Sequence, residues 1–166
     1  MNFKIAPRSK GVKFSTWGPV IILLSVYLTS WLVGGNGWDL FSNIVYDVVV
    51  VSLIILYMFG PKGYSISTDG IEIRRYIKSI MIPNKEIKVV KIISETNLSK
   101  IIANGGIFSY WGKFRESNGE IVRVYCTRLN DIVQITTTTQ NYYLSPEDPE
   151  GFVQSARKCL NIINDK

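Results

Sequence analysis

The sequence contains no histidine and only two cysteines, Cys126 and Cys159. Without histidine, neither a Ser-His nor a Cys-His catalytic pair can form, and the commonest metal ligand is missing. The two cysteines lie far apart without a CxxC spacing, so the sequence indicates neither a zinc site nor a disulfide framework. We therefore expect a protein that is not an enzyme, with reduced thiols and with no catalytic residue, metal or cofactor.

Charge is also scarce and unevenly placed. Charged residues make up 19% of the chain, and the net charge is +6. Lysine and arginine are absent from residues 17–60, in which the only charges are Asp39 and Asp47. The basic groups therefore lie on both sides of an apolar region. This arrangement favours a membrane protein over a nucleic-acid binder, in which basic groups would form one dense stripe.

Two apolar runs, residues 17–34 and 40–60, each predict a transmembrane helix. The second run spans about 30 Å at the helical rise of about 1.5 Å per residue. The positive-inside rule places the basic arm of residues 1–16 and Lys62 in the cytoplasm, with a short extracytoplasmic loop at residues 35–39. Both termini are then cytoplasmic. Two alternatives stay open: a buried hairpin of soluble helices and, for the first run, a cleaved signal peptide.

From Gly63 onward, short β-rich segments alternate with turn residues. Alternating apolar and polar residues, as in Ile71–Arg74, indicate strands with one buried and one wet face. Near the C-terminus, Asp148 and Pro149 predict the N-cap and first residue of an amphipathic helix. The expected strands are residues 64–67, 71–75, 79–82, 88–93, 107–114, 121–127, 132–137 and 141–144.

Residues 63–164 resemble the bacterial pleckstrin-homology-like domains that follow one or two transmembrane helices. The resemblance rests on the first hairpin Tyr64–Ile71, the glycine-aromatic run Gly106–Phe114 and the segment Tyr143–Phe152. It implies a membrane α-helical hairpin followed by an all-β PH-like barrel of about seven antiparallel strands, capped by the C-terminal amphipathic helix. Because eight strands are predicted, we expect one of 79–82 and 88–93 to be wrong.

The resemblance implies a membrane-associated binding or assembly module at the cytoplasmic face of the bacterial inner membrane. The expected partners are the membrane and either another protein or a second copy of the chain. No nucleic acid and no small-molecule substrate is indicated. Two alternatives are a sensor of anionic lipid head groups or of a phosphorylated ligand, and a small oligomeric transporter or channel.

The sensor alternative rests on Arg74, Arg75 and Lys78, which cluster in the hairpin after the second predicted strand. Such a group can hold a phosphate or an acidic head group by charge-assisted hydrogen bonds. The turn at residues 68–70 contains an acid and no base, unlike the usual phosphoinositide pattern. A solvated basic turn is therefore the alternative.

The basic arm is a candidate for contact with the membrane surface. Each cation next to an anionic leaflet gains about 1 kcal/mol. The orientation of the first helix in the membrane, set by the positive-inside rule, explains the same charges without a specific lipid contact. As a further alternative, Phe3 and Ile5 pair this arm with the edge of a strand. The four basic residues are Lys4, Arg8, Lys10 and Lys13.

Two single residues are further candidates. Asp47 lies inside the second apolar run, where a carboxylate suggests oligomer packing or proton handling. Its alternatives are a position among the head groups or a hydrogen bond to the first helix. Along residues 107–114, alternation assigns Phe108, Tyr110 and Phe114 to the core face. Trp111 then lies on the other face as a candidate contact with a partner, with a place in the core as the alternative.

Overall fold

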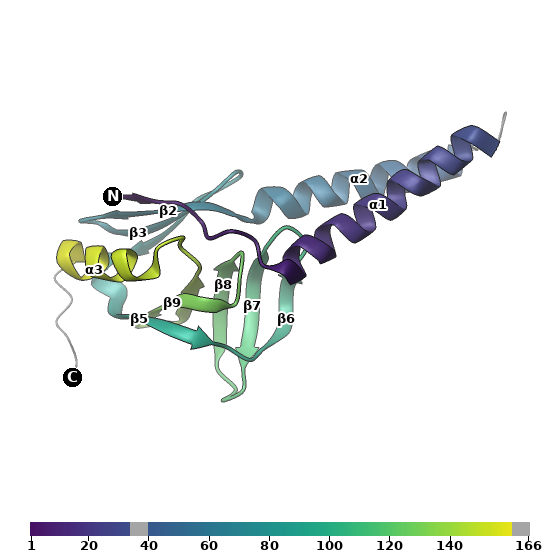
Figure 1. The fold of residues 1–166 in the computed structure, drawn as a ribbon. Helices are drawn as coiled ribbons and strands as arrows, with labels where there is room; N and C mark the ends of the chain where they lie inside the picture. Colours follow the sequence, from purple (N-terminus) through teal and green to yellow (C-terminus); the bar gives the residue numbers. More distant parts are fainter. Residues whose placement is uncertain (34–39, 161–166) are drawn as a thin grey trace.

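The computed structural model describes residues 1–33 and 40–160 (Figure 1). Two long helices, α1 (Lys10–Val33) and α2 (Leu40–Phe59), lie side by side and project from a strand-rich body. The predicted loop at residues 35–39 lies outside the described residues. α1 begins at Lys10 and not at residue 17, because Ser9 acts as its N-cap: the Ser9 hydroxyl accepts the Val12 N–H at 3.3 Å.

Many described apolar side chains of both helices face outward, although Val12 near the start of α1 is fully buried. Ile22 is 63% exposed and Val48 is 59% exposed. The stretch Lys10–Thr29 is long and apolar enough to cross a membrane, whereas α2 contributes a shorter apolar segment, Ile44–Phe59. Of the two predicted spans, the structure therefore contains one as a candidate span and the other as a shorter apolar helical segment.

Two sheets form the body. A short 3-10 helix, η1 (Asn84–Glu86), connects them. The first sheet has the order β1-β2-β3-β4, with β1 (Asn2–Phe3), β2 (Pro61–Ser67), β3 (Gly70–Arg75) and β4 (Ile80–Pro83). The second has the order β5-β9-β10-β8-β7-β6, with β5 (Ile87–Glu95), β6 (Leu98–Gly105), β7 (Tyr110–Glu116), β8 (Ile121–Cys126), β9 (Asn130–Thr137) and β10 (Asn141–Leu144).

The prediction of a closed barrel of about seven antiparallel strands is wrong. The strands form two open sheets, and β10 pairs in parallel with β8. The parallel pair arises because β8 and β9 run in opposite directions. β10 turns back from β9 and lies between these two strands, so it runs in the same direction as β8. We expected one of the predicted strands at residues 79–82 and 88–93 to be wrong. Both are present, as β4 and β5.

The largest error in the strand prediction concerns β6 and the turn that follows it. No strand was expected at β6, and the strand expected at residues 107–114 begins only at Tyr110. Phe108 lies in the turn with a φ of 63°. The Asn104 side chain holds this turn by donating to the carbonyl oxygens of Ile107 at 2.6 Å and Ser109 at 2.7 Å.

The main core lies between the two sheets and α3 (Pro149–Leu160), which packs on β2, β5 and β9. Asp148 caps α3 as predicted, with its Oδ1 accepting the Gly151 N–H at 2.9 Å. Phe152 is fully buried and meets Tyr64 edge to face, with ring centroids 6.1 Å apart. A second, smaller core that includes Phe114 lies along the second sheet.

Candidate functional site

Residues 1–9, which we call the N-terminal strap, are built into the body. β1 pairs with β2, so that Phe3 lies opposite Tyr64, and Ile5 forms a bridge with Pro146. The alternative in which Phe3 and Ile5 pair the arm with a strand edge is therefore confirmed. The strap runs over the sheets to the start of α1, as Figure 1 shows.

Hydrogen bonds fix the second half of the strap to the second sheet. The Ala6 N–H donates to the Ser145 carbonyl at 2.8 Å, and the Thr127 hydroxyl donates to the Ala6 carbonyl at 2.7 Å. Farther along, the Ser9 N–H donates to the Thr127 carbonyl at 3.2 Å. Ala6, Thr127 and Ser145 are almost fully buried, so water does not compete for these hydrogen bonds. α1 thus starts from a fixed point on the body.

Both helices are also bonded to the region around the β6–β7 turn. In α1, the buried Thr16 hydroxyl accepts the Phe108 N–H at 2.8 Å. In α2, Phe59 stacks on Trp111 with ring centroids 5.3 Å apart, and the Trp111 Nε1–H donates to the Leu56 carbonyl at 3.2 Å. The helices therefore join the body at several points.

Trp111, the predicted partner contact, is half-buried against α2. Its ring face and its indole N–H are used within the chain, which leaves a smaller accessible surface than sequence alternation suggested. A role of Trp111 in binding a partner stays a prediction.

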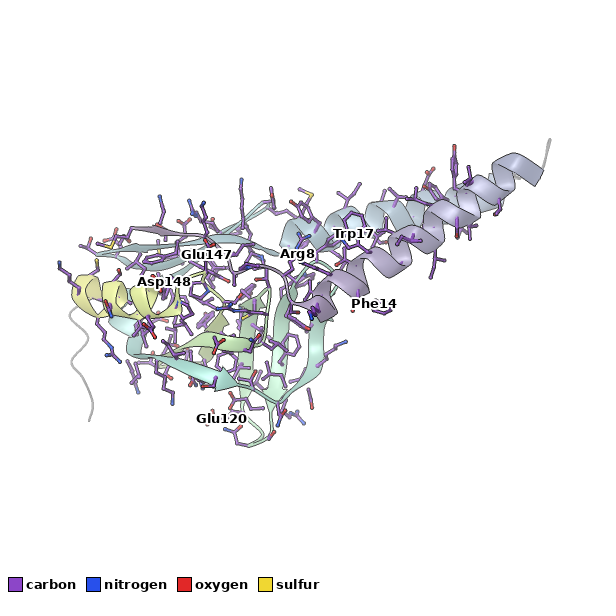
Figure 2. All side chains as sticks on the ribbon, in the orientation of Figure 1. Arg8, Phe14, Trp17, Glu120, Glu147 and Asp148 are labelled. Carbon is purple, nitrogen blue, oxygen red and sulfur yellow. The ribbon has the colours of Figure 1, made fainter. Side chains whose placement is uncertain are left out.

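The four basic residues of the arm divide into two groups. Lys4, Lys10 and Lys13 are exposed, whereas Arg8 is half-buried, with its guanidinium 5.7 Å from the centroid of the Phe108 ring. Figure 2 shows Phe14 and Trp17 at the inner end of α1, and these side chains are 81% and 59% exposed. Exposed aromatic rings beside lysines are typical of the membrane–water interface. Contact with the membrane surface stays a prediction.

The structure does not bring Arg74, Arg75 and Lys78 together on one face. Arg74 and Arg75 are neighbours in β3 and so point to opposite faces of the sheet. The Arg75 Nε–H donates to the Lys78 carbonyl at 2.6 Å, and its guanidinium lies 5.8 Å from the Phe59 ring centroid. The Arg74 Nε is buried without a hydrogen-bond partner in the described part of the chain. Ligand binding by this hairpin stays a prediction.

Asp47 lies exposed on α2. The alternative of a hydrogen bond to the first helix would need a hydroxyl such as that of Ser25 or Thr29. Both already donate within α1: Ser25 to the Ile22 carbonyl at 2.8 Å and Thr29 to the Ser25 carbonyl at 2.9 Å. The role of Asp47 stays a prediction.

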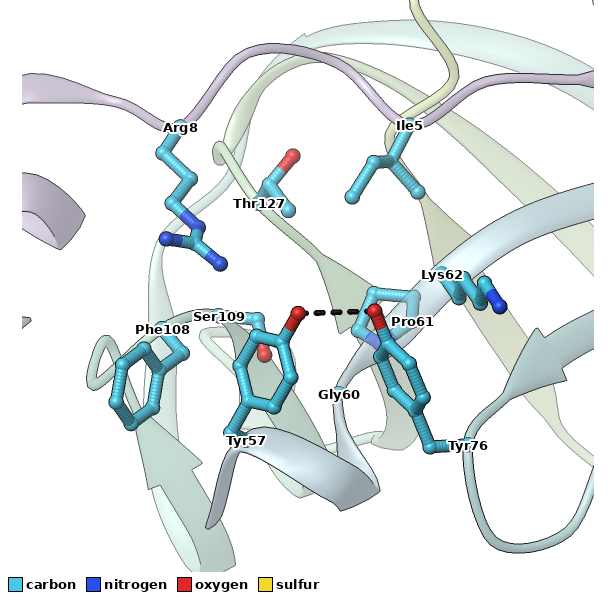
Figure 3. A pocket seen from close by; sticks show the side chains of 10 residues that line it. All are labelled: Ile5, Arg8, Tyr57, Gly60, Pro61, Lys62, Tyr76, Phe108, Ser109 and Thr127. Carbon is cyan, nitrogen blue, oxygen red and sulfur yellow. Dashed lines mark hydrogen bonds between the residues drawn. The ribbon is translucent and has the colours of Figure 1, made fainter. Parts of the chain in front are cut away.

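A pocket of about 100 Å³ lies where the strap, the inner end of α2, the start of β2, the β3–β4 turn and the β6–β7 turn meet (Figure 3). At its centre the Tyr57 and Tyr76 hydroxyls form a hydrogen bond of 2.8 Å, with Arg8 pointing toward them. Lys62 lies 4.8 Å from the centroid of the Tyr76 ring. Sequence reasoning missed this pocket, because its walls come from segments far apart in the chain.

Two titratable groups are sealed in the core. The Tyr64 hydroxyl donates to the Tyr125 carbonyl at 2.7 Å and accepts the Ser145 N–H at 3.1 Å. Burial raises the pKa of Tyr64 above its ordinary value and likewise raises that of the Cys126 thiol. Both groups stay neutral and serve packing. Within residues 1–33 and 40–160, no group of three or more His, Cys, Asp and Glu side chains could hold a metal ion.

Two β-sheets covered by a C-terminal helix are consistent with a PH-like fold. The model of the bacterial PH domain family matches residues 62–159, and the chain belongs to this family. Domains of this kind are generally binding modules without catalysis. Comparison with curated proteins gave no match, and neither did comparison with solved structures.

Proposed function

We propose that this protein is a non-enzymatic binding or scaffold module whose PH domain is tethered at the cytoplasmic face of the bacterial inner membrane. The observation that carries the proposal is the attachment of an outward-facing apolar helical pair to the body. The strap is bonded to both sheets, and both helices are bonded near the β6–β7 turn. A helix so attached holds the domain in one orientation.

The inner end of α1 supports attachment to a membrane. Phe14 and Trp17 are largely exposed there, and Lys10 and Lys13 are exposed beside them. Aromatic side chains suit the head-group region, and lysines favour the anionic cytoplasmic leaflet. The arm and Lys62 then lie on the cytoplasmic side, as does the PH domain.

The second sheet supports binding of a protein partner or of a second copy. Its last strand, β6, has one open edge, and Ile102 on this strand is 75% exposed. Unpaired backbone groups of an edge strand can pair with another chain. Confinement to a membrane raises the local concentration of such a domain near its target.

Photo-crosslinking of the full chain in native membranes tests this proposal. A photoreactive side chain at Ile102 is expected to give a discrete protein adduct, whereas the same side chain at Ser117, exposed in the β7–β8 turn, is not. A chain that fractionates with the cytosol, or that gives the same diffuse adducts at both positions, would contradict the proposal. The mass of the adduct separates a second copy from another protein.

The two alternatives keep their own tests. If this hairpin is a sensor, replacing Arg74, Arg75 and Lys78 together with alanine should abolish binding of the PH domain, within the full chain, to anionic lipid head groups. Asp47→Ala should abolish transport or change oligomer size if α2 forms a channel. The opposite orientations of Arg74 and Arg75 in β3 give the sensor less support than tethering.

A further inference from the structure

The pocket in Figure 3 carries more donors than the fold uses. Arg8 points into it from the strap, yet its side chain has no hydrogen bond or ion pair with any described residue. A guanidinium carries five N–H donors. The Phe108 ring, 5.7 Å away, contacts Arg8 without accepting any of these hydrogens in a conventional hydrogen bond. Arg8 is therefore positioned but not neutralised.

The tyrosine pair supplies a further donor. Between them the Tyr57 and Tyr76 hydroxyls have two hydrogens, and their mutual bond of 2.8 Å uses one. The second hydrogen is available to an acceptor in the pocket. Lys62 adds a positive charge at the rim, beside Tyr76. No aspartate or glutamate lines the pocket, so its lining has a net positive charge.

Ser109 is the strongest sign of a ligand. Its side chain lines the pocket and is only 3% exposed, yet its hydroxyl has no hydrogen-bond partner among the described residues. A buried polar group without a partner is costly, and native proteins rarely leave one. Gly60, which also lines the pocket, lies close beside this hydroxyl: a Cβ at Gly60 would lie 2.6 Å from the Ser109 Oγ.

We propose that this pocket binds a phosphate group, with Arg8 as the main charge and the hydroxyls of Ser109 and the tyrosine pair as further donors. Its volume of about 100 Å³ corresponds to roughly three water molecules, which suits one tetrahedral oxyanion. Arg8 suits phosphate because a guanidinium can donate two parallel hydrogen bonds to it. The same chemistry serves free phosphate and the phosphate of a lipid head group.

The site differs from the hairpin of Arg74, Arg75 and Lys78, none of which lines the pocket. It also differs from the exposed lysines of the arm. Binding of a soluble phosphate here does not depend on the proposed tethering function, so the two proposals can fail separately.

The test measures phosphate binding by the full chain with two probes. In the first arm, inorganic phosphate is titrated by calorimetry into protein purified in a maltoside detergent, which contains no phosphate. In the second, native mass spectrometry counts phosphatidic acid molecules retained by the detergent-purified protein. Arg8→Gln should weaken binding about tenfold or more, as expected for a lost charge-assisted hydrogen bond. Arg115→Gln, which removes the same charge from an exposed site on β7, should leave it unchanged.

Two further variants keep the test decisive if the first variant misfolds. Ser109→Ala removes the unpartnered hydroxyl with little change in volume and should weaken binding about threefold to tenfold, while the thermal unfolding midpoint stays near that of the unmodified chain. Gly60→Ala should weaken binding by placing a methyl group against Ser109. These two decide the matter if Arg8→Gln fails to fold.

Arg8-dependent binding in the first arm alone identifies a free phosphate, and in the second arm a lipid head group. Either result supports the site. The absence of saturable binding in both arms would overturn it, and so would equal binding by Arg8→Gln, Ser109→Ala and Arg115→Gln.

Discussion

The sheets and the helical pair use the same apolar residue types in opposite ways. In the sheets, Ile66, Ile71 and Ile73 are at most 1% exposed, whereas on the helices Ile22 and Val48 are more than half exposed. The body completes its core by folding two sheets and α3 onto each other. The exposed apolar side chains of the helical pair have no such cover among the described residues. We propose that lipid covers these side chains.

The largest effect should follow from a deletion in the body's core. Ile73→Ala should lower the free energy of unfolding of the full chain by about 2–5 kcal/mol, because a cavity remains between the sheets. Ile121→Ala, at a side chain 52% exposed, should change it by no more than about 0.5 kcal/mol. Denaturant titration in mild detergent measures both. Equal effects at the two positions would remove the distinction between core and surface.

A charged substitution on α1 should have a different effect from the same substitution on the body. Leu24 and Ile121 are 57% and 52% exposed. Leu24→Arg should cost about 2.5–3.5 kcal/mol of membrane insertion, whereas Ile121→Arg should cost nothing, because its side chain faces water. The share of the chain left in membranes after an alkaline carbonate wash measures the difference. Identical recovery of both variants would argue against lipid around α1.

The strap, which joins the two regions, should respond to loss of one buried bond. Thr127→Val removes the donor to the Ala6 carbonyl and should lower the free energy of unfolding by about 1 kcal/mol. Amide hydrogen exchange at Ala6 and Ser9 should speed up. Thr138→Val, at an exposed position, is the matched control. Unaltered exchange in Thr127→Val would show that this bond does not hold the strap.

The smallest effect concerns the thiols. Burial raises the pKa of Cys126, so this thiol stays protonated near pH 8.5, where an ordinary cysteine is about half ionised. The half-buried Cys159 should react with a maleimide first, and Cys126 only after denaturation. Because the unfolded thiol ionises first, the free energy of unfolding should fall as pH rises above about 8.5. Equal labelling rates in the native chain would disprove the sealed core around Cys126.

Local patterns were enough to predict most strands and the last helix. Alternation as in Ile71–Arg74 marks β3, and Asp148 with Pro149 marks the start of α3. These features depend on neighbours in the sequence. The family resemblance predicted membership of the bacterial PH domain family but not the open sheets, since strand closure depends on long-range pairing.

Features that depend on distant residues escaped prediction. β6 was missed because its polar and glycine residues resemble a turn, and Phe108 was placed in a strand although the turn held by Asn104 gives it a positive φ. The α1 cap at Ser9 was overlooked within a run of basic residues. The pocket could not be foreseen, since Arg8 meets Tyr57 and Ser109 only in the folded chain.

Cysteine accessibility in native membranes tests most directly whether lipid covers the helices. In a chain with serine at Cys126 and Cys159, Leu24→Cys and Ile121→Cys present thiols at two similarly exposed positions, one on α1 and one on β8. With membranes opened to a charged maleimide, we expect Ile121→Cys to react at once and Leu24→Cys to react only after detergent is added. Equal rates at the two positions before detergent would contradict lipid coverage.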